Sequence, residues 1–254
     1  MITAICRGIS PRFNECEITH IGRQTINLMK ARAQHEEYVR TLAFLGCTIL
    51  ELPEEKDFPD SVFVEDTAIV LPEIAIIANP GAVSRAGETE SIARVLAQFR
   101  PIVKLPPSAT LDGGDVLVMG RQIYVGMSTR SNFKSLTQLR NILSPLDYQV
   151  IGIEVHGCLN LKSAVSRVND DTVLINRQWV DGIQFNRFKM IDIAATEPHA
   201  ANCLPLHGEI LFPSSYPKTR ERLERVGFCI RAIDLDEITK AEGAVTCCSL
   251  ILDD

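Results

Sequence analysis

Aromatic residues and long apolar runs are both scarce in this sequence. Phe, Trp and Tyr make up 6% of the 254 residues, and there is one tryptophan. No stretch approaches the roughly 18 apolar residues of a membrane-spanning helix. The first seven residues, Met1 to Arg7, lack the apolar core and cleavage site of a secretory signal peptide. We therefore expect a cytoplasmic protein with no membrane partner.

The sequence also lacks an excess of positive charge. It has 26 Lys and Arg against 32 Asp and Glu, for a formal net charge of −6. This balance disfavours nucleic acid and anionic membranes as partners and favours the approach of a small cation. The length is sufficient to bury a core without disulfides or metals, and we predict one domain over residues 1–254.

Several motifs of common sites are missing. The 8 cysteines include no Cys-x-x-Cys pair and no histidine at zinc spacing, so we predict no metal site and reduced thiols. The segment Asp112-Gly-Gly-Asp115 has neither the spacing nor the lysine of a phosphate-binding loop. There is no serine nucleophile elbow.

What the sequence does contain is a repeated pattern of elements. A strand, tight turn, strand, polar loop, helix and strand occur at residues 60–105 and again at 112–155. Fainter copies follow at 159–194 and 201–233. A strand at 245–252 would complete a fifth unit with an N-terminal strand at 2–9, a helix at 24–45 and a strand at 47–52. Such a unit would join the two ends of the chain.

Two residues stand out as candidates for chemistry. Cys247 follows a Gly-Ala turn and begins the expected 245–252 strand, a position that can expose a thiol while its neighbours hold it rigidly. A small buried core residue is the alternative interpretation, and strand alternation would point Cys248 away from the site. Asp66 precedes an apolar run, so its carboxylate either lies in solvent at a strand end or is buried where a cationic ligand would relieve its cost.

Five segments together resemble one known family, the dimethylarginine dimethylaminohydrolases of the guanidino-group-modifying (pentein) superfamily. The resemblance covers essentially the whole chain, and it implies an α/β fold: a five-bladed α/β propeller of ββαβ modules with pseudo-fivefold symmetry and an active site in the central channel. The segments are Phe58-Pro-Asp-Ser-Val-Phe-Val-Glu-Asp66, Leu111-Asp-Gly-Gly-Asp-Val116, Leu159-Asn-Leu-Lys162, Ala201-Asn-Cys203 and Thr246-Cys-Cys-Ser249.

The resemblance also implies roles for individual residues. Cys247 would attack the guanidinium carbon, and water would then release citrulline without a metal or organic cofactor. Carboxylates would hold the guanidinium nitrogens, two arginines would hold the substrate's α-carboxylate, and a lid would close over them. The implied substrate-binding residues are Ile18 in the lid, Asp60, Phe63, Glu65, Asp66, Arg85 and Arg130.

The chain departs from the family at one catalytic position. Where the family has a histidine that protonates the leaving amine and activates water, this sequence has Asn160, with Asp112 expected to orient it. Asparagine does not titrate near neutral pH, and the loss of a general acid/base costs about 10² to 10⁴ in rate. His156 lies four residues along an expected strand, roughly 13 Å away, so His20 in the lid-like loop is the more reachable surrogate.

Three explanations are compatible with Asn160: a natural homologue of weak or altered activity, an engineered replacement of the histidine, or a binder that no longer turns over. The first hypothesis is hydrolysis of Nω-methylated arginine to citrulline and methylamine or dimethylamine. The alternative is a catalytically silent binder of arginine-like guanidinium ligands, and hydrolysis of unmethylated arginine uses the same residues. The resemblance is compatible with a monomer or a homodimer, with a homodimer slightly favoured.

Overall fold

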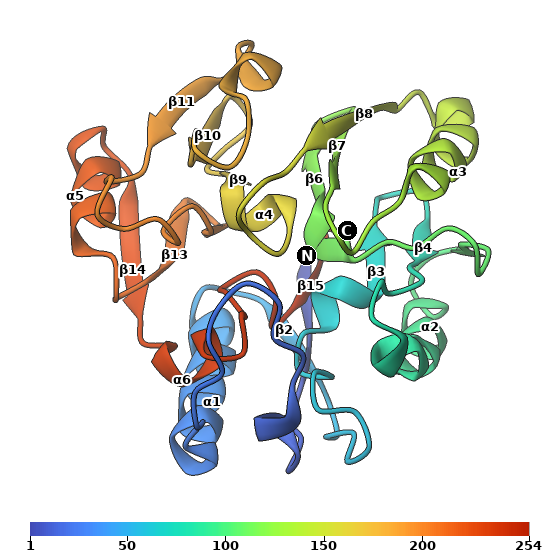
Figure 1. The fold of residues 1–254 in the computed structure, drawn as a ribbon, viewed down its shortest axis with the longest axis horizontal. Coiled ribbons are helices and arrows are strands. Elements are labelled where there is room, and N and C mark those ends of the chain that lie inside the picture. Colours follow the sequence, from blue (N-terminus) through green and yellow to red (C-terminus); the bar gives the residue numbers. More distant parts are fainter. Residues whose placement is uncertain (254) are drawn as a thin grey trace.

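The computed structural model describes residues 1–253. Within that range, fifteen short strands form five three-stranded sheets arranged around a central axis (Figure 1). In every sheet the middle strand pairs antiparallel with one neighbour and parallel with the other. The expected five-bladed α/β propeller is confirmed.

The sheets have the orders β15-β1-β2, β3-β4-β5, β6-β7-β8, β9-β10-β11 and β12-β13-β14. The strands are β1 (Ile2–Arg7), β2 (Thr48–Leu52), β3 (Ala68–Val70), β4 (Ala75–Ile77), β5 (Ile102–Lys104), β6 (Val116–Met119), β7 (Gln122–Met127), β8 (Gln149–Glu154), β9 (Val165–Arg167), β10 (Thr172–Ile175), β11 (Lys189–Asp192), β12 (Leu204–Leu206), β13 (Glu209–Pro213), β14 (Cys229–Ile233) and β15 (Leu250–Asp253).

Most of the longer helices lie on the periphery of the ring, whereas the short helix α4 lies near its centre (Figure 1). The α-helices are α1 (Leu28–Phe44), α2 (Thr89–Leu96), α3 (Phe133–Leu143), α4 (Leu161–Ala164), α5 (Pro217–Arg225) and α6 (Asp236–Thr239). The 3₁₀ turns are η1 (Phe13–Glu15), η2 (Val64–Thr67), η3 (Val83–Glu88), η4 (Gly113–Asp115), η5 (Ser144–Leu146) and η6 (Gly182–Phe185).

The module from β6 to β8 shows how local sequence produces this unit. Gly120, at φ 61°, makes the tight turn between β6 and β7, a conformation that costs glycine little. The Asn132 side chain then caps α3 by accepting from the Ser135 backbone N–H at 3.0 Å. Leu136 and Leu139 lie buried on the inner helix face. They pack with residues of both this module and the preceding one, so the cores lie between neighbouring modules.

Two expected strands differ in the structure. The segment expected to be extended from residue 159 instead forms α4 before β9 begins at Val165. The last strand begins at Leu250 rather than at Val245, because the backbone between them hydrogen-bonds locally. Cys247 N–H donates to the Ala244 carbonyl, and the Val245 carbonyl accepts from the Tyr38 hydroxyl. These groups are therefore used in a turn and not in a sheet.

The module that contains β9, β10 and β11 has only the 3₁₀ turn η6 where the others have an α-helix. Its Asp181 side chain caps that turn by accepting from Ile183 N–H at 2.9 Å. The connection between β10 and β11 is short and contains Gly182, which disfavours a longer helix. The pseudo-fivefold repeat is thus weakest on this side of the ring.

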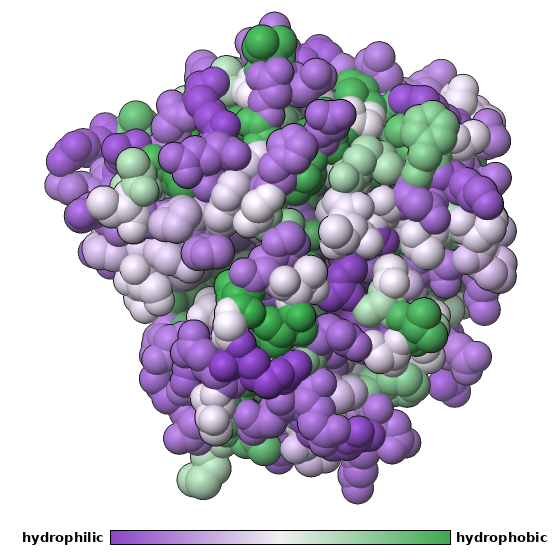
Figure 2. Space-filling model, viewed as in Figure 1, coloured by the Kyte–Doolittle hydropathy of each residue, from purple (hydrophilic) through white to green (hydrophobic). Residues whose placement is uncertain are grey.

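Ring closure depends on β1, which lies between β15 and β2. Thr3 is opposite both Leu252 and Thr48, so the two ends of the chain share one sheet. This places the Cys247 turn beside η2, where Glu65 N–H donates to the Cys247 carbonyl at 3.2 Å. Side chains fill the middle of the ring on the face seen in Figure 2. Among residues 1–253, no helix combines the length and apolar character needed to cross a membrane.

Candidate active site

A small cavity of about 20 Å³ lies where four modules meet at the centre of the ring. Seven of the ten residues expected at the site line it, and they come from turns that precede regular elements. The seven are Asp60, Phe63, Asp66, Arg85, Arg130, Asn160 and Cys247. Five further lining residues were not predicted: Glu17, Leu159, Ala241, Glu242 and Gly243.

Cys247 is half-buried in its turn, whereas the neighbouring Cys248 is fully buried. Burial raises the pKa of the Cys247 thiol well above its usual range, and the negative charges of Glu65 and Asp66 add to that effect. The thiol is therefore protonated in the free protein at neutral pH. A cation in the cavity would act in the opposite direction and favour the thiolate.

Asp66 is held on η2 with both carboxylate oxygens engaged. Oδ1 accepts from Gly114 N–H at 3.0 Å, and Oδ2 accepts from Arg85 at 2.6 Å. A Cβ atom at Gly114 would lie 2.8 Å from Asp66 Oδ1 and 3.0 Å from Asn160 Oδ1. Glycine at this position therefore lets the Asp66 and Asn160 side chains approach the same point from two modules.

Asp60 accepts the Glu17 backbone N–H with its two oxygens, at 3.3 and 3.1 Å. Burial raises the pKa of the Asp60 carboxyl, while the charge of Arg85 opposes the rise. Asp60 thus connects the cavity to the loop that covers it.

The two arginines expected to bind a carboxylate have different environments. Arg85, 4% exposed, donates to Asp66, to Glu88 and to two backbone carbonyls. Its guanidinium is largely used by the protein, so its geometry favours positioning Asp66 over holding a ligand. Arg130 donates from its side chain only to Thr19 Oγ1, at 3.0 Å, among the described residues. Arg130 is therefore the arginine that is available to a substrate carboxylate.

Asn160 lies at the start of α4 with 6% of its surface exposed. Its Nδ2 is buried and makes no hydrogen bond of ordinary geometry within residues 1–253, although the Asn160 side chain lies close enough to Asp115 to lower the pKa of that carboxyl. The expected hydrogen bond with Asp112 is absent from that part of the chain, because Asp112 instead accepts the Gly81 N–H at 2.8 Å. Asp112 does not line the cavity. Asp112 therefore does not contact Asn160 through a hydrogen bond, and its role in orienting Asn160 stays a prediction.

Two buried carboxyl groups near Asn160, those of Asp112 and Asp115, have raised pKa values. Burial, together with the nearby charge of Asp66, raises the pKa of Asp112 to about 7. Burial also raises the pKa of Asp115 to about 6, although hydrogen bonds from Ser128 and Ser131 oppose the rise. Asp115 also accepts the Leu161 N–H at 2.9 Å, and so fixes the start of α4 directly after Asn160.

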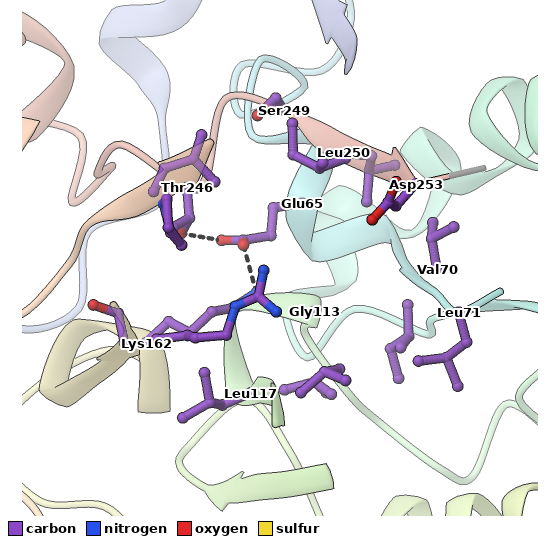
Figure 3. Close-up of a pocket in the computed structure, with 18 of the residues that line it drawn as sticks. Glu65, Val70, Leu71, Gly113, Leu117, Lys162, Thr246, Ser249, Leu250 and Asp253 are labelled. Atoms are coloured by element: carbon purple, nitrogen blue, oxygen red, sulfur yellow. Dashed lines mark hydrogen bonds and ion pairs between the residues drawn. The ribbon is translucent and has the colours of Figure 1, made fainter. Parts of the chain in front are cut away.

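Glu65 faces a different cavity from the one that Cys247 lines. It belongs to a larger space of about 520 Å³ and forms an ion pair with Lys162. Its other oxygen accepts from Thr246 at 2.7 Å, and Figure 3 shows the carboxylate between these two partners. A direct substrate contact for Glu65 does not agree with this placement. Glu65 instead connects Lys162 and Thr246 between the two cavities.

The expected lid is the loop of residues 14–20 around Ile18. In the structure its first residues belong to η1, and the irregular loop covers residues 17–25. Ile18 is half-buried against the core and does not line the cavity, whereas Glu17 does. Ala241 and Glu242 follow α6, and no motif in the sequence marked them. Leu159 and Gly243 lay inside segments already singled out. Within the described chain, no group of three or more His, Cys, Asp or Glu side chains is arranged to hold a metal ion.

Known proteins resemble this chain in both sequence and fold. A family profile described as eukaryotic N,N dimethylarginine dimethylhydrolase matches residues 14–251. An N(G),N(G)-dimethylarginine dimethylaminohydrolase of Streptomyces coelicolor is 38% identical over 252 residues, covering 98% of this chain and 96% of that protein. The chain belongs to the dimethylarginine dimethylaminohydrolase family.

Solved structures of this family share the fold. A Cys-to-Ser variant of the Pseudomonas aeruginosa enzyme, complexed with citrulline, superposes with a TM-score of 0.93 at 30% identity, covering 99% of this chain and 100% of that one. A His-to-Gly variant of a dimethylarginine dimethylaminohydrolase, solved as an adduct with S-methyl-L-thiocitrulline, gives a TM-score of 0.93 at 32% identity with the same coverage. Family and fold together support a hydrolase that acts on C–N bonds.

Proposed function

We propose that this protein hydrolyses Nω-methylated arginine to citrulline and methylamine or dimethylamine through a covalent bond to Cys247. The observation that carries the proposal is the cavity itself. A half-buried thiol, two buried carboxylates and an available arginine line one small space. A planar cation with a distant carboxylate matches that set of charges.

Binding and thiol activation are coupled in this arrangement. Asp60 and Asp66 accept hydrogen bonds from the guanidinium, and Arg130 receives the α-carboxylate. The bound positive charge lowers the high pKa of the Cys247 thiol, whose proton leaves to solvent. Substrate binding therefore favours formation of the thiolate that attacks it.

The bond changes follow from this nucleophile. The thiolate attacks the central guanidinium carbon and forms a C–S bond. The C–N bond to the methylated nitrogen breaks, and the amine departs with an added proton, leaving a thiouronium on Cys247. Water then attacks the same carbon, the C–S bond breaks, and citrulline is released as the thiol regains a proton. No metal or organic cofactor takes part in these steps.

Asn160 limits both proton transfers. Its Nδ2–H can donate a hydrogen bond to the leaving nitrogen or to the attacking water, but it cannot give up a proton. Protonation of the amine then relies on water, which slows the reaction by about 10² to 10⁴ relative to a general acid at this place. We therefore propose a slow hydrolase.

A second function is compatible with the same cavity. The high thiol pKa and the asparagine also suit a protein that binds guanidinium ligands without turnover. Unmethylated L-arginine fits the same charges, and so it belongs in the same test.

Two ligands separate these alternatives. With dimethyl-L-arginine, the hydrolase forms citrulline and the silent binder does not. With S-methyl-L-thiocitrulline, the leaving group departs as a thiolate and needs no acid, so intact-mass spectrometry should find an adduct even when amine loss is slow. Binding without citrulline and without an adduct would establish the silent binder. L-Arginine as a third ligand shows whether the methyl groups are required.

A further inference from the structure

Glu242, which lines the cavity, hydrogen-bonds the backbone of the 17–25 loop. Its Oε2 accepts Thr19 N–H at 2.7 Å, and its Oε1 accepts the N–H groups of His20 and Ile21 at 2.6 and 3.0 Å. Three successive backbone donors thus converge on one carboxylate, as in an anion-binding nest. Hydrogen bonds to an ionised acceptor are among the stronger ones in proteins.

None of the side chains of residues 17–25 is fully buried, although Ile18 packs partly against the core. Hydrogen bonds at the two ends of the loop add to those of Glu242. Ser84 donates to the Glu17 carboxylate, Arg23 donates to the Asn14 and Cys16 carbonyls, and Lys240 donates to the Thr25 carbonyl. Two further bonds connect the loop to cavity residues. Asp60 accepts Glu17 N–H, and Arg130 donates to Thr19 Oγ1. Segments held by a few polar contacts open with small free energies, so these bonds decide how often the loop is closed.

The loop's anchor residue is itself rigidly placed. Glu242 has φ 58°, a left-handed conformation that is uncommon for a residue with a long side chain. Gly243 follows it, and a Cβ there would lie 2.3 Å from the Phe63 ring. Gly243 N–H and Ala241 N–H both donate to the Ile238 carbonyl and complete the end of α6. The tertiary structure therefore maintains a costly backbone geometry directly beneath the loop.

We infer that Glu242 is a positioning residue that latches the 17–25 loop and so sets the affinity of the cavity for its guanidinium ligand. Glu242 also borders a neighbouring space of about 270 Å³ that contains His20 and His199, so its carboxylate separates that space from the cavity of Cys247. Release of the latch opens the cavity on this side. The link to ligand affinity rests on the proposed function, whereas the latch itself does not.

Two variants test the latch. Glu242→Asn keeps a residue that tolerates positive φ, but it is one methylene too short to reach the three donors. Glu242→Gln keeps the length and removes the charge. Hydrogen exchange on the whole protein should show the Thr19, His20 and Ile21 amides exchanging at least about tenfold faster in both variants, because bonds to a charged acceptor are lost. Glu221→Gln, which breaks an exposed ion pair on α5, should leave these amides unchanged.

L-Citrulline, which undergoes no reaction, serves as the probe of affinity. Its Kd should rise about tenfold or more in both Glu242 variants and stay constant in Glu221→Gln. If the amides of Thr19 to Ile21 exchange in the Glu242 variants as slowly as in the wild-type protein, Glu242 does not latch the loop. If exchange is faster but the Kd of citrulline is unchanged, the latch does not affect ligand binding. If the wild-type protein does not bind citrulline at all, the proposed function fails, and the exchange data still decide the latch.

Discussion

Arg85 donates a hydrogen bond of 2.6 Å to Asp66 at the edge of the cavity that Cys247 lines. Both side chains are almost completely buried, with 5% and 6% of their surfaces exposed. The pair holds one oxygen of Asp66 in the cavity that also contains the thiol. An arginine expected to bind substrate thus supports an acid that is proposed to do so.

This difference between the arginines can be tested with one substitution at each. Arg130→Met should raise the Kd of citrulline by roughly 10- to 100-fold with little change in stability, because it removes a charge-assisted bond to the ligand. Arg85→Met should instead destabilise the protein by about 3 to 5 kcal/mol, since it leaves Asp66 and Glu88 buried without their cation. Titration calorimetry and denaturant unfolding measure the two effects, and equal losses of stability would refute the distinction.

Asn160 determines the rate in the proposed mechanism. Asn160→His places a group that titrates near neutral pH at the start of α4, and citrulline formation from dimethyl-L-arginine should increase by about 10² to 10⁴. Asn169→His, at an exposed turn between β9 and β10, is the control and should have no effect. An Asn160→His protein that is folded, binds citrulline and is no faster would show that this position does not serve proton transfer.

The paired cysteines provide a matched test of the nucleophile. Cys247→Ser should give no mass adduct with S-methyl-L-thiocitrulline, because the serine hydroxyl is far less acidic and less nucleophilic than a thiol. Cys248→Ala removes a buried thiol that does not line the cavity and should retain the adduct. Peptide mapping locates the modification. An adduct on Cys248, or on another cysteine, would contradict the assignment.

The buried carboxyls predict a dependence of stability on pH. With a pKa of about 7 in the folded protein, Asp112 retains its proton where the unfolded chain, near pKa 4, has lost it. The folded state then binds more protons than the unfolded state, so stability falls as pH rises from about 4 to 7. Asp112→Asn should make this slope shallower in urea unfolding between pH 4.5 and 7. An unchanged slope would mean that Asp112 titrates normally.

The sequence predicted the modules because each one is local. Strand, turn, helix and strand within about 45 residues leave periodic apolar patterns, and closure by the terminal strands followed from counting them. The short helix α4 and the turn before β15 were missed. Their backbone bonds depend on partners such as Tyr38, which lies far away in the sequence.

The sequence predicted which residue types form the site, but it did not predict which residues contact one another. Cys247, Asp66 and Asn160 lie in recognisable segments, and the cavity contains all three. The bond from Gly114 to Asp66 spans 48 residues, and that from Thr19 to Glu242 spans 223, so no local pattern could reveal either one. For the same reason, Glu65 was placed with its sequence neighbour Asp66 although the two carboxylates face different cavities.

The pairing of β15 with β1 has a consequence for how this protein is made. The Cys247 turn is positioned by a strand that the ribosome delivers after all the others, while the acids and arginines emerge much earlier. A nascent chain therefore carries these charged side chains long before the Cys247 sulfur can reach them. The proposed attack of Cys247 on a guanidinium therefore requires that β15 has been synthesised and has paired with β1.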